Sequence, residues 1–176
     1  MLNKAIFSGF GGQGVLMMGY SLSHGAVKEG LNVTFLPSYG AEMRGGTANC
    51  TVCISDEEIA SPITSTPDFL IVMNIPSLYV FQNRVARGGI IFMNSSIVNV
   101  EPVRKDVAVK KVDCVGIAEK FGDARMANVA MMGKFLRETG VVSPDSYLQG
   151  LAELLGKKKK GILEANANVF NAAFNG

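Results

Sequence analysis

A glycine-rich turn at residues 8–14, SGFGGQG, limits the possible folds of this chain more than any other stretch. It follows a short apolar run and precedes an apolar-periodic segment that extends to Val27, so it predicts a strand, a turn and a helix. Gly9, Gly11 and Gly14 have G-x-G-x-x-G spacing, which lets the backbone turn with positive φ and approach a ligand closely. The N-terminus of the following helix suits an anion.

Dinucleotide binding is the first function to test against this turn. It requires an acidic residue about 20 positions on, at the end of the second strand. The second strand, residues 32–36, ends without one, because Glu29 precedes it and Glu42 comes too late. Gly12 and Gln13 also depart from what NAD binding requires. Two alternatives remain: a turn that only packs a helix on a strand or, as we favour, a loop offered to another site with Gln13 as a side-chain donor.

A second glycine-containing loop follows the second strand and reads PSYGAEMRGG at residues 37–46. It places Ser38, Tyr39, Glu42 and Arg44 between glycines. Ligands of open α/β sheets bind beyond the carboxyl ends of the strands, so we expect the two loops to lie side by side there. Arg44 could bind a carboxylate or phosphate in a forked geometry, and Glu42 could hold Arg44 or act as an acid. The alternative is an ordinary loop with an internal Glu–Arg pair.

The remaining pattern predicts an α/β fold of three layers, with a mostly parallel sheet flanked by helices and an antiparallel hairpin portion. Continuous apolar runs at residues 68–74 and 90–94 are typical of central strands buried on both faces. We expect one domain over residues 1–176. The other expected strands are 47–55, a short return strand at 58–62 and a strand near 107–113; the expected helices are 12–29, 76–85, 125–138, 143–155 and 162–174.

Three features of the sequence leave alternatives open. Asn74 and Asn94 each end a buried strand, and their amides either point towards one ligand edge or cap the following turns. The helix at 125–138 has a Met-rich face that is either core or a subunit contact. The charge run at residues 157–160 is read as a solvated turn, with a partner-binding patch as the alternative.

Composition favours a protein with a partner. Apolar residues make up 48% of the chain and charged residues 18%, below the roughly 25% of an ordinary soluble domain. A compact chain with so few charges and nine Met leaves apolar surface for a contact. A formal charge of +2 is too small to indicate nucleic acid binding. We expect no membrane span and no signal peptide, and three Cys fit a reducing cytoplasm.

No self-sufficient catalytic set is visible in the sequence. His24 is the one histidine, at a position expected to be packed or at the surface. Cys50 and Cys53, three apart in a strand, point to opposite faces and cannot together chelate a metal without a bulge. The turn lacks the Lys-Ser/Thr ending of a phosphate-binding P-loop. We therefore expect no catalytic residue and no metal site within this chain alone, and interpret the two loops as part of a site that another chain completes.

Several motifs in a fixed order resemble the gamma subunit of 2-oxoacid:ferredoxin oxidoreductases, the pyruvate/ketoisovalerate oxidoreductase gamma-domain family. They are the turn from Gly9 to Gly14, the run SYGAEMRGGTAN at 38–49, and the pairs at 55–56, 61–62 and 67–68. The resemblance covers about residues 3 to 175 and is closer to the 2-oxoglutarate or branched-chain type than to the pyruvate type. Ala41 stands where the pattern has proline, which removes no functional group.

The resemblance implies a complex that oxidatively decarboxylates a 2-oxoacid, 2-oxoglutarate being the expected one. It joins the acyl group to coenzyme A and passes electrons to ferredoxin. Thiamine diphosphate, magnesium and an iron–sulfur cluster are expected on alpha, beta and delta or ferredoxin-like partner subunits, and none on this chain alone. The isolated chain could form a homodimer. Two other functions stay open: an independent nucleotide-binding domain and a purely structural subunit.

The resemblance also implies roles for residues of both loops near the thiamine site. Gly9, Gly11, Gly12, Gln13 and Gly14 would form one part of a wall where coenzyme A enters. Ser38, Tyr39, Glu42 and Arg44 would form the other part. Backbone N–H groups and the Arg44 side chain would contact a phosphate or the substrate carboxylate, while Gln13 would position a reacting group.

Overall fold

The computed structural model describes residues 1–39, 47–156 and 160–176, and those residues form one six-stranded sheet in the order β2-β3-β1-β4-β5-β6. The pairs β1–β3 and β2–β3 are antiparallel, and the pairs β1–β4, β4–β5 and β5–β6 are parallel. The strands are β1 (Leu2–Phe10), β2 (Asn32–Tyr39), β3 (Thr47–Ser55), β4 (Phe69–Val72), β5 (Ile90–Asn94) and β6 (Ala108–Val112). Every strand except β3 therefore points its carboxyl end to the same edge.

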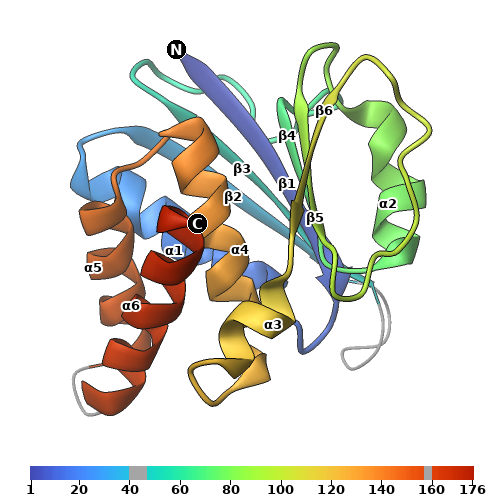
Figure 1. Ribbon diagram of the computed structural model, residues 1–176. Coiled ribbons are helices and arrows are strands. Elements are labelled where there is room, and N and C mark those ends of the chain that lie inside the picture. The colour runs from blue at the N-terminus through green and yellow to red at the C-terminus, as the bar shows by residue number, and fades with distance from the viewer. Residues whose placement is uncertain (40–46, 157–159) are drawn as a thin grey trace.

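Helices cover the two faces of this sheet unequally (Figure 1). On one face lie α1, α4 and a second layer made by α5 and α6, while α2 lies on the other face (Figure 1). We call these the thick face and the thin face. The helices are α1 (Val15–Lys28), α2 (Ile75–Phe81), α3 (Cys114–Glu119), α4 (Ala127–Thr139), α5 (Pro144–Leu155) and α6 (Lys160–Asn175), with 3-10 turns η1 (Gln82–Arg84) and η2 (Ala124–Met126).

Aromatic packing anchors α4 to the sheet on the thick face. The ring of Phe135 meets those of Phe7, Phe69 and Phe92 edge-on, with centroids 5.9, 5.6 and 5.3 Å away. Edge-to-face contacts at such separations are favourable beyond the area that they bury. Phe135 itself is fully buried, so it is the natural centre of the larger core.

Glycines allow the second helical layer to approach the first. A Cβ on Gly133 of α4 would lie 2.4 Å from the backbone oxygen of Phe170 in α6. A Cβ on Gly25 of α1 would lie 3.0 Å from the Cα of Tyr147 in α5. The rings of Tyr147 and Phe170 then stack at 5.0 Å between the two helices of this outer layer.

The observed architecture confirms the predicted three-layer α/β fold with its antiparallel portion. One predicted element is wrong: residues 58–62 form no return strand but irregular chain. Pro62 cannot donate to a ladder, which weakens any pairing of this segment. Cys50 and Cys53 of the C-x-x-C pair are both buried and make no disulfide. No helix within the described residues is long and apolar enough to cross a membrane.

Candidate functional site at the carboxyl edge

The turn between β1 and α1 uses its glycines for backbone conformations that other residues rarely adopt. Gly12 has φ of 99° and Gly14, the N-cap of α1, has φ of 72°. The first helical hydrogen bond runs from Met18 N–H to the oxygen of Gly14 (3.0 Å). The N–H groups of the preceding residues in the first turn therefore have no acceptor within the helix and present partial positive charge.

The side chain of Gln13 braces this turn. Its Oε1 accepts a hydrogen bond from Phe10 N–H (2.7 Å), and its Nε2 donates one to the backbone oxygen of Met73 (3.0 Å). Gly9 leaves the room that the amide needs, because a Cβ there would lie 2.6 Å from Oε1. The amide thus joins the end of β1 to the segment just after β4, and the turn is held rigid by its own side chain.

This brace lies at the point where the chain reverses its direction of winding. From β1 the chain passes through α1 towards β2, and from β4 it passes through α2 towards β5, on the other side of the sheet order. In open α/β sheets such a switch point is where ligands bind beyond the strands. Because Gln13 spans β1 and β4, its amide occupies the mouth of that crevice, and a ligand would lie outside it rather than within.

The second loop begins and ends at this same edge. Phe10, the last residue of β1, pairs with Thr47, the first residue of β3, while Tyr39 at the end of β2 pairs with Ala48. Ser38 is exposed one position earlier on β2. The prediction that the two loops leave one edge next to each other is confirmed for their described ends. Glu42 and Arg44 lie outside the described residues.

Strand order explains why this turn does not form a dinucleotide site in the usual way. In that fold the second strand lies beside the first, so that its terminal acid reaches the ribose. Here β3 is inserted between β1 and β2. The end of β2 is therefore displaced by two strand spacings, about 10 Å, from β1. Together with the missing acid, this displacement separates the turn from the ribose-binding position.

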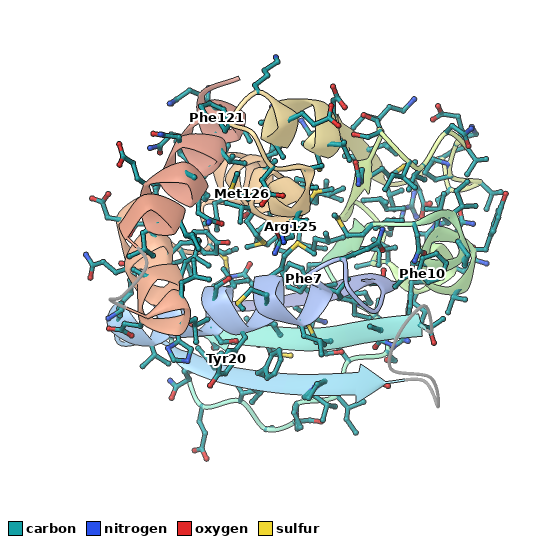
Figure 2. All side chains as sticks on the ribbon, turned by 90° about the horizontal axis from the view of Figure 1, so that it is seen from below. Phe7, Phe10, Tyr20, Phe121, Arg125 and Met126 are labelled. Atoms are coloured by element: carbon teal, nitrogen blue, oxygen red, sulfur yellow. The ribbon has the colours of Figure 1, made fainter. Side chains whose placement is uncertain are left out.

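Two cavities border the N-terminus of α1. The smaller, of about 230 Å³, is lined by Gly12, Gln13 and Asn94 among others. The larger, of about 470 Å³, begins at Gly14 and is mainly apolar. Arg125 lines both cavities. Arg125 is labelled in Figure 2, which views the molecule from below. The rigid turn therefore borders two cavities that could hold a ligand.

Arg125 is held in place by a carboxylate of its own segment. Its Nε and Nη2 atoms donate to the two oxygens of Asp123 at 2.9 and 2.7 Å. These hydrogen bonds from the guanidinium lower the pKa of Asp123 below its usual range. The pair carries no net charge, and the Nε and Nη2 donors are already engaged, so Arg125 adds no strong local field beside the cavities.

The two asparagines at strand ends cap the following turns, and each also keeps an unused donor. Oδ1 of Asn74 accepts from Ser77 N–H (2.9 Å), and Oδ1 of Asn94 accepts from Ser96 N–H (3.3 Å). Both side chains are buried, and neither Nδ2 has a partner among the described residues. The sequence left capping and ligand contact open. Capping is what the structure shows, while the spare Nδ2 of Asn94 adjoins the smaller cavity.

Comparison with known proteins assigns this chain to a family. A sequence model of the family described as Pyruvate ferredoxin/flavodoxin oxidoreductase matches residues 4–176. The chain belongs to this family. Ketoisovalerate oxidoreductase subunit VorA of Methanothermobacter thermautotrophicus is 40% identical over 167 residues, which cover 94% of this chain and 34% of that protein. The chain thus spans about a third of the length of the VorA relatives.

A further relative and two solved structures match nearly the whole length of this chain. The 2-oxoglutarate synthase subunit KorC of Methanothermobacter marburgensis is 34% identical over 176 residues, covering 95% of each chain. The solved gamma subunit of a keto/oxoacid ferredoxin oxidoreductase from Geobacter sulfurreducens superposes with a TM-score of 0.83 at 24% identity, covering 98% of this chain and 96% of that one. A 2-oxoglutarate:ferredoxin oxidoreductase from Magnetococcus marinus gives 0.89 at 20% identity, covering 98% and 30%. These two structural matches establish the fold.

The thiols of this oxidoreductase-family chain are buried, and that of Cys50 donates to the backbone oxygen of Val15 at the start of α1 (3.8 Å). Burial raises the pKa of the Cys50 thiol to about 12, and burial also raises that of Cys114. His24 lies on α1 with Nδ1 3.7 Å from Glu153 of α5. Among the described residues, no group of three or more His, Cys, Asp or Glu side chains could hold a metal ion.

Two residues near the turn were not predicted from the sequence to belong to the site. Asn128 of α4 packs against Gly14, where a Cβ would lie 2.4 Å from Nδ2, and this Nδ2 donates to Gly14 O at 3.5 Å. A polar residue on the Met-rich face of this helix was the available signal. Arg125 was read only as the start of the helix at 125–138, and nothing in the sequence relates it to the turn.

Proposed function

We propose that the chain is the gamma subunit of a thiamine-diphosphate-dependent 2-oxoacid:ferredoxin oxidoreductase, a single gamma-type domain over residues 1–176. Alpha, beta and delta or ferredoxin-like subunits would supply thiamine diphosphate, magnesium and the iron–sulfur cluster, and ferredoxin would accept the electrons in the cytoplasm. The observation that carries this proposal is that the described ends of two glycine loops leave the sheet at one edge. Among the described residues around them there is no histidine, thiolate or metal cluster to act alone.

The proposed role of the chain is to form part of the wall through which coenzyme A reaches the thiamine centre. Cofactor chemistry creates and oxidises the acyl carbanion on the partner subunits. The backbone of Gly11 and Gly12 would face the ligand, because neither residue has a side chain to block a close approach and glycine permits the positive φ at position 12. Ser38 and Tyr39 start the second loop, from which Arg44, oriented by Glu42, would bind a phosphate or carboxylate.

Gln13 receives a different role from the one that the sequence suggested. Both ends of its amide are engaged with backbone groups of Phe10 and Met73. The second N–H of Nε2 has no acceptor among the described residues, and Gln13 lines the smaller cavity. We therefore propose that Gln13 fixes the wall in place and contributes at most this one donor to a ligand.

The proposed substrate is 2-oxoglutarate, with a branched-chain 2-oxoacid as the second candidate. The full-length match to KorC proteins supports the first. The higher identity to VorA supports the second. Turnover of the reconstituted complex with 2-oxoglutarate, 2-ketoisovalerate and pyruvate distinguishes them, and a complex that prefers pyruvate would contradict both.

The test of the site is Arg44→Ala in the reconstituted complex. Loss of a charge-assisted hydrogen bond of about 1.5–3 kcal/mol predicts a KM for coenzyme A or the oxoacid raised roughly tenfold or more, with assembly unchanged. Arg44→Lys keeps the charge without the fork and should lie between wild type and alanine. Arg137→Ala, at the far end of α4, removes the same charge and serves as the control. Unchanged kinetics for Arg44→Ala would reject the role.

Calorimetry separates this proposal from an independent nucleotide-binding domain, and the loop variants separate it from a purely structural subunit. The isolated chain should bind adenine nucleotides weakly, because its site is completed by other subunits. Submicromolar binding of a dinucleotide to the isolated chain would favour the independent domain instead. If the isolated chain is dimeric, addition of the partner subunits should convert it into the complex.

A further inference from the structure

Hydrogen-bond donors without partners gather at the smaller of the two cavities beside the glycine turn. Gly12, Gln13 and Asn94 belong to its lining. The oxygens of the two amides already accept hydrogen bonds, Oε1 of Gln13 from Phe10 N–H (2.7 Å) and Oδ1 of Asn94 from Ser96 N–H (3.3 Å). The groups of these amides that remain without a partner among the described residues are therefore N–H groups, one on Nε2 of Gln13 and those on Nδ2 of Asn94.

Asn94 carries the stronger of these signals. Its side chain is completely buried, and a buried amide donor without an acceptor destabilises the folded chain. Asn74, at the end of β4, is its counterpart: it is buried, caps the turn that follows and has a spare Nδ2, but it lines neither of the two cavities beside the turn. The spare donor alone therefore does not define a site, whereas a spare donor at a cavity does point to a ligand.

The amides of Gln13 and Asn94 converge on the same part of the lining. Val72 of β4 pairs with Met93 of β5, so the next residues, Met73 and Asn94, leave the sheet edge side by side. The backbone oxygen of Met73 is also the acceptor of Nε2 of Gln13 (3.0 Å), and Met73 lines the cavity. One ligand group beside Met73 would therefore be close to both amides.

The charges around this cavity do not favour an anion. Arg125 is the charged member of its lining, and Asp123 neutralises it (2.7 Å). Asp113, the N-cap of α3, is a further carboxylate nearby, and Lys111 of β6 is paired with Glu101. A carboxylate or phosphate that entered would lose its hydration without a compensating positive charge. An uncharged carbonyl oxygen needs only the donors that are present.

Size and polarity limit the ligand further. The other members of the lining are apolar: Met73, Ile97, Val115, Ala124 and Ala127. The volume of about 230 Å³ lies below the roughly 300–1,000 Å³ of pockets that hold a whole drug-sized ligand, so this cavity fits one slender arm of a ligand. Gly14, the N-cap whose helix end suits an anion, lines the larger cavity and not this one.

We infer that the smaller cavity receives a secondary amide group of the ligand. Its carbonyl oxygen accepts from Nδ2 of Asn94 and from the second N–H of Nε2 of Gln13, and its alkyl part lies against Met73 and Ile97. This inference deepens the proposed function and rests on it, because the amide-bearing arm of coenzyme A has this chemistry. Charged parts of the ligand remain outside, where Arg44 is proposed to bind them.

A titration of the wild-type chain tests the cavity directly, because this chain alone forms the lining. The probes are N-methylacetamide, the simplest secondary amide of this type, and acetate, which carries a charge. In ¹H–¹⁵N spectra, N-methylacetamide should shift the side-chain amide signals of Asn94 and Gln13 and leave that of Asn74 in place. If the Asn94 signal does not move, or if acetate moves it as far, the inference is overturned, and the spare donor then serves a bound water or an anion.

Asn94→Asp tests the same contact in the reconstituted complex, with Asn74→Asp as its matched control. Each change keeps the capping oxygen and replaces a buried spare donor by an acceptor, but only residue 94 lines the cavity. Asn94→Asp should raise the KM for coenzyme A about tenfold or more, and Asn74→Asp should leave it near the wild-type value. Thermal unfolding shows whether the two variants are destabilised to a similar extent.

The kinetics also separate this inference from the proposed function. If Asn94→Asp keeps the wild-type KM in a complex in which Arg44→Ala raises it, the assignment of the cavity is overturned while the proposed function stands. If neither variant changes the KM, both are overturned. If Asn74→Asp raises the KM as much as Asn94→Asp does, the effect comes from the buried charge and not from the cavity, and the inference is wrong.

Discussion

The two faces of the sheet use apolar side chains in different ways. On the thick face, α1 and α4 bury a large cluster around Phe135, and α5 and α6 cover those helices in turn. On the thin face a smaller buried cluster, which includes Leu78 and Ile91, lies beneath α2. Outside that cluster, Tyr79 and Val80 remain largely exposed. The two faces therefore differ in the size of the core that they bury, and the short helix α2 covers the smaller core of the thin face.

The low share of charged residues in the sequence can now be related to the structure. The excess of apolar residues predicts exposed surface, and the Met-rich helix offered one place for it. Met131 and Met132 are fully buried, so that helix face is core. Exposed apolar side chains lie in several other places, among them Tyr79 and Val80 on α2 and Val27 on α1.

The largest expected effect comes from truncating the centre of the thick face. Phe135→Ala removes a ring in contact with three others and should destabilise the chain by about 4 kcal/mol. Leu78→Ala on the thin face should cost nearer the lower end of the usual 2–5 kcal/mol range, because its smaller cluster can relax more easily. Urea unfolding measures both. A larger loss for Leu78→Ala would contradict the contrast between the faces.

The second helical layer provides the next test. Gly133→Ala places a Cβ 2.4 Å from the backbone oxygen of Phe170 and 2.9 Å from the Cβ of Ala173, so α6 must move. Overpacking of this kind costs about 1–3 kcal/mol. Gly161→Ala in α6 is the control, because no described atom lies within 4 Å of the added Cβ, and it should be neutral or stabilising. Equal effects in thermal unfolding would mean that α4 and α6 are not closely packed.

Much of the fold could be predicted because the local signals agree. The uninterrupted apolar runs of β4 and β5 indicate strands buried on both faces, and Ser143-Pro144 marks the start of α5. The prediction of a strand at residues 58–62 was wrong, because the β-like composition of this segment does not show whether a neighbouring strand is available for pairing. The insertion of β3 between β1 and β2 is likewise a long-range choice that no local pattern specifies.

Only part of the candidate site could be predicted from the sequence. The glycine turn and the second loop could be found from spacing, and their shared edge follows from strand direction. The engagement of the Gln13 amide with Phe10 and Met73 could not be read, since Met73 is 60 residues away. Asn128 of α4 contacts the turn, and Arg125 of η2 lines the cavities beside it, through packing that depends on the tertiary structure.

Gln13 joins the end of β1 to the segment just after β4, and its replacement should lower the free energy of unfolding moderately. Gln13→Met keeps the side-chain length but loses the hydrogen bonds to Phe10 and Met73. The net loss should be about 1–2 kcal/mol in urea unfolding. Gln149→Met, on the exposed side of α5, is the matched control and should be near neutral. A neutral Gln13→Met would mean that the turn is fixed by its glycines alone.

The smallest expected effect concerns a clamp between α4 on the thick face and the edge strand β6. Glu138 pairs with Lys110 of β6 (2.7 Å) and with Lys134 of its own helix (3.2 Å). The hydrogen bond from Lys110 lowers the pKa of the Glu138 carboxyl below its usual value of 4.5. A carboxyl whose pKa is lowered by folding stabilises the folded chain above its unfolded pKa, and this contribution disappears as the pH falls through the folded pKa. Glu138→Gln should therefore cost about 0.2–1 kcal/mol at pH 7 and nothing at the acid end of a pH series, as measured by urea unfolding with Glu119→Gln as the control. A loss that persists unchanged at low pH would show that the clamp acts through packing and not through its charge.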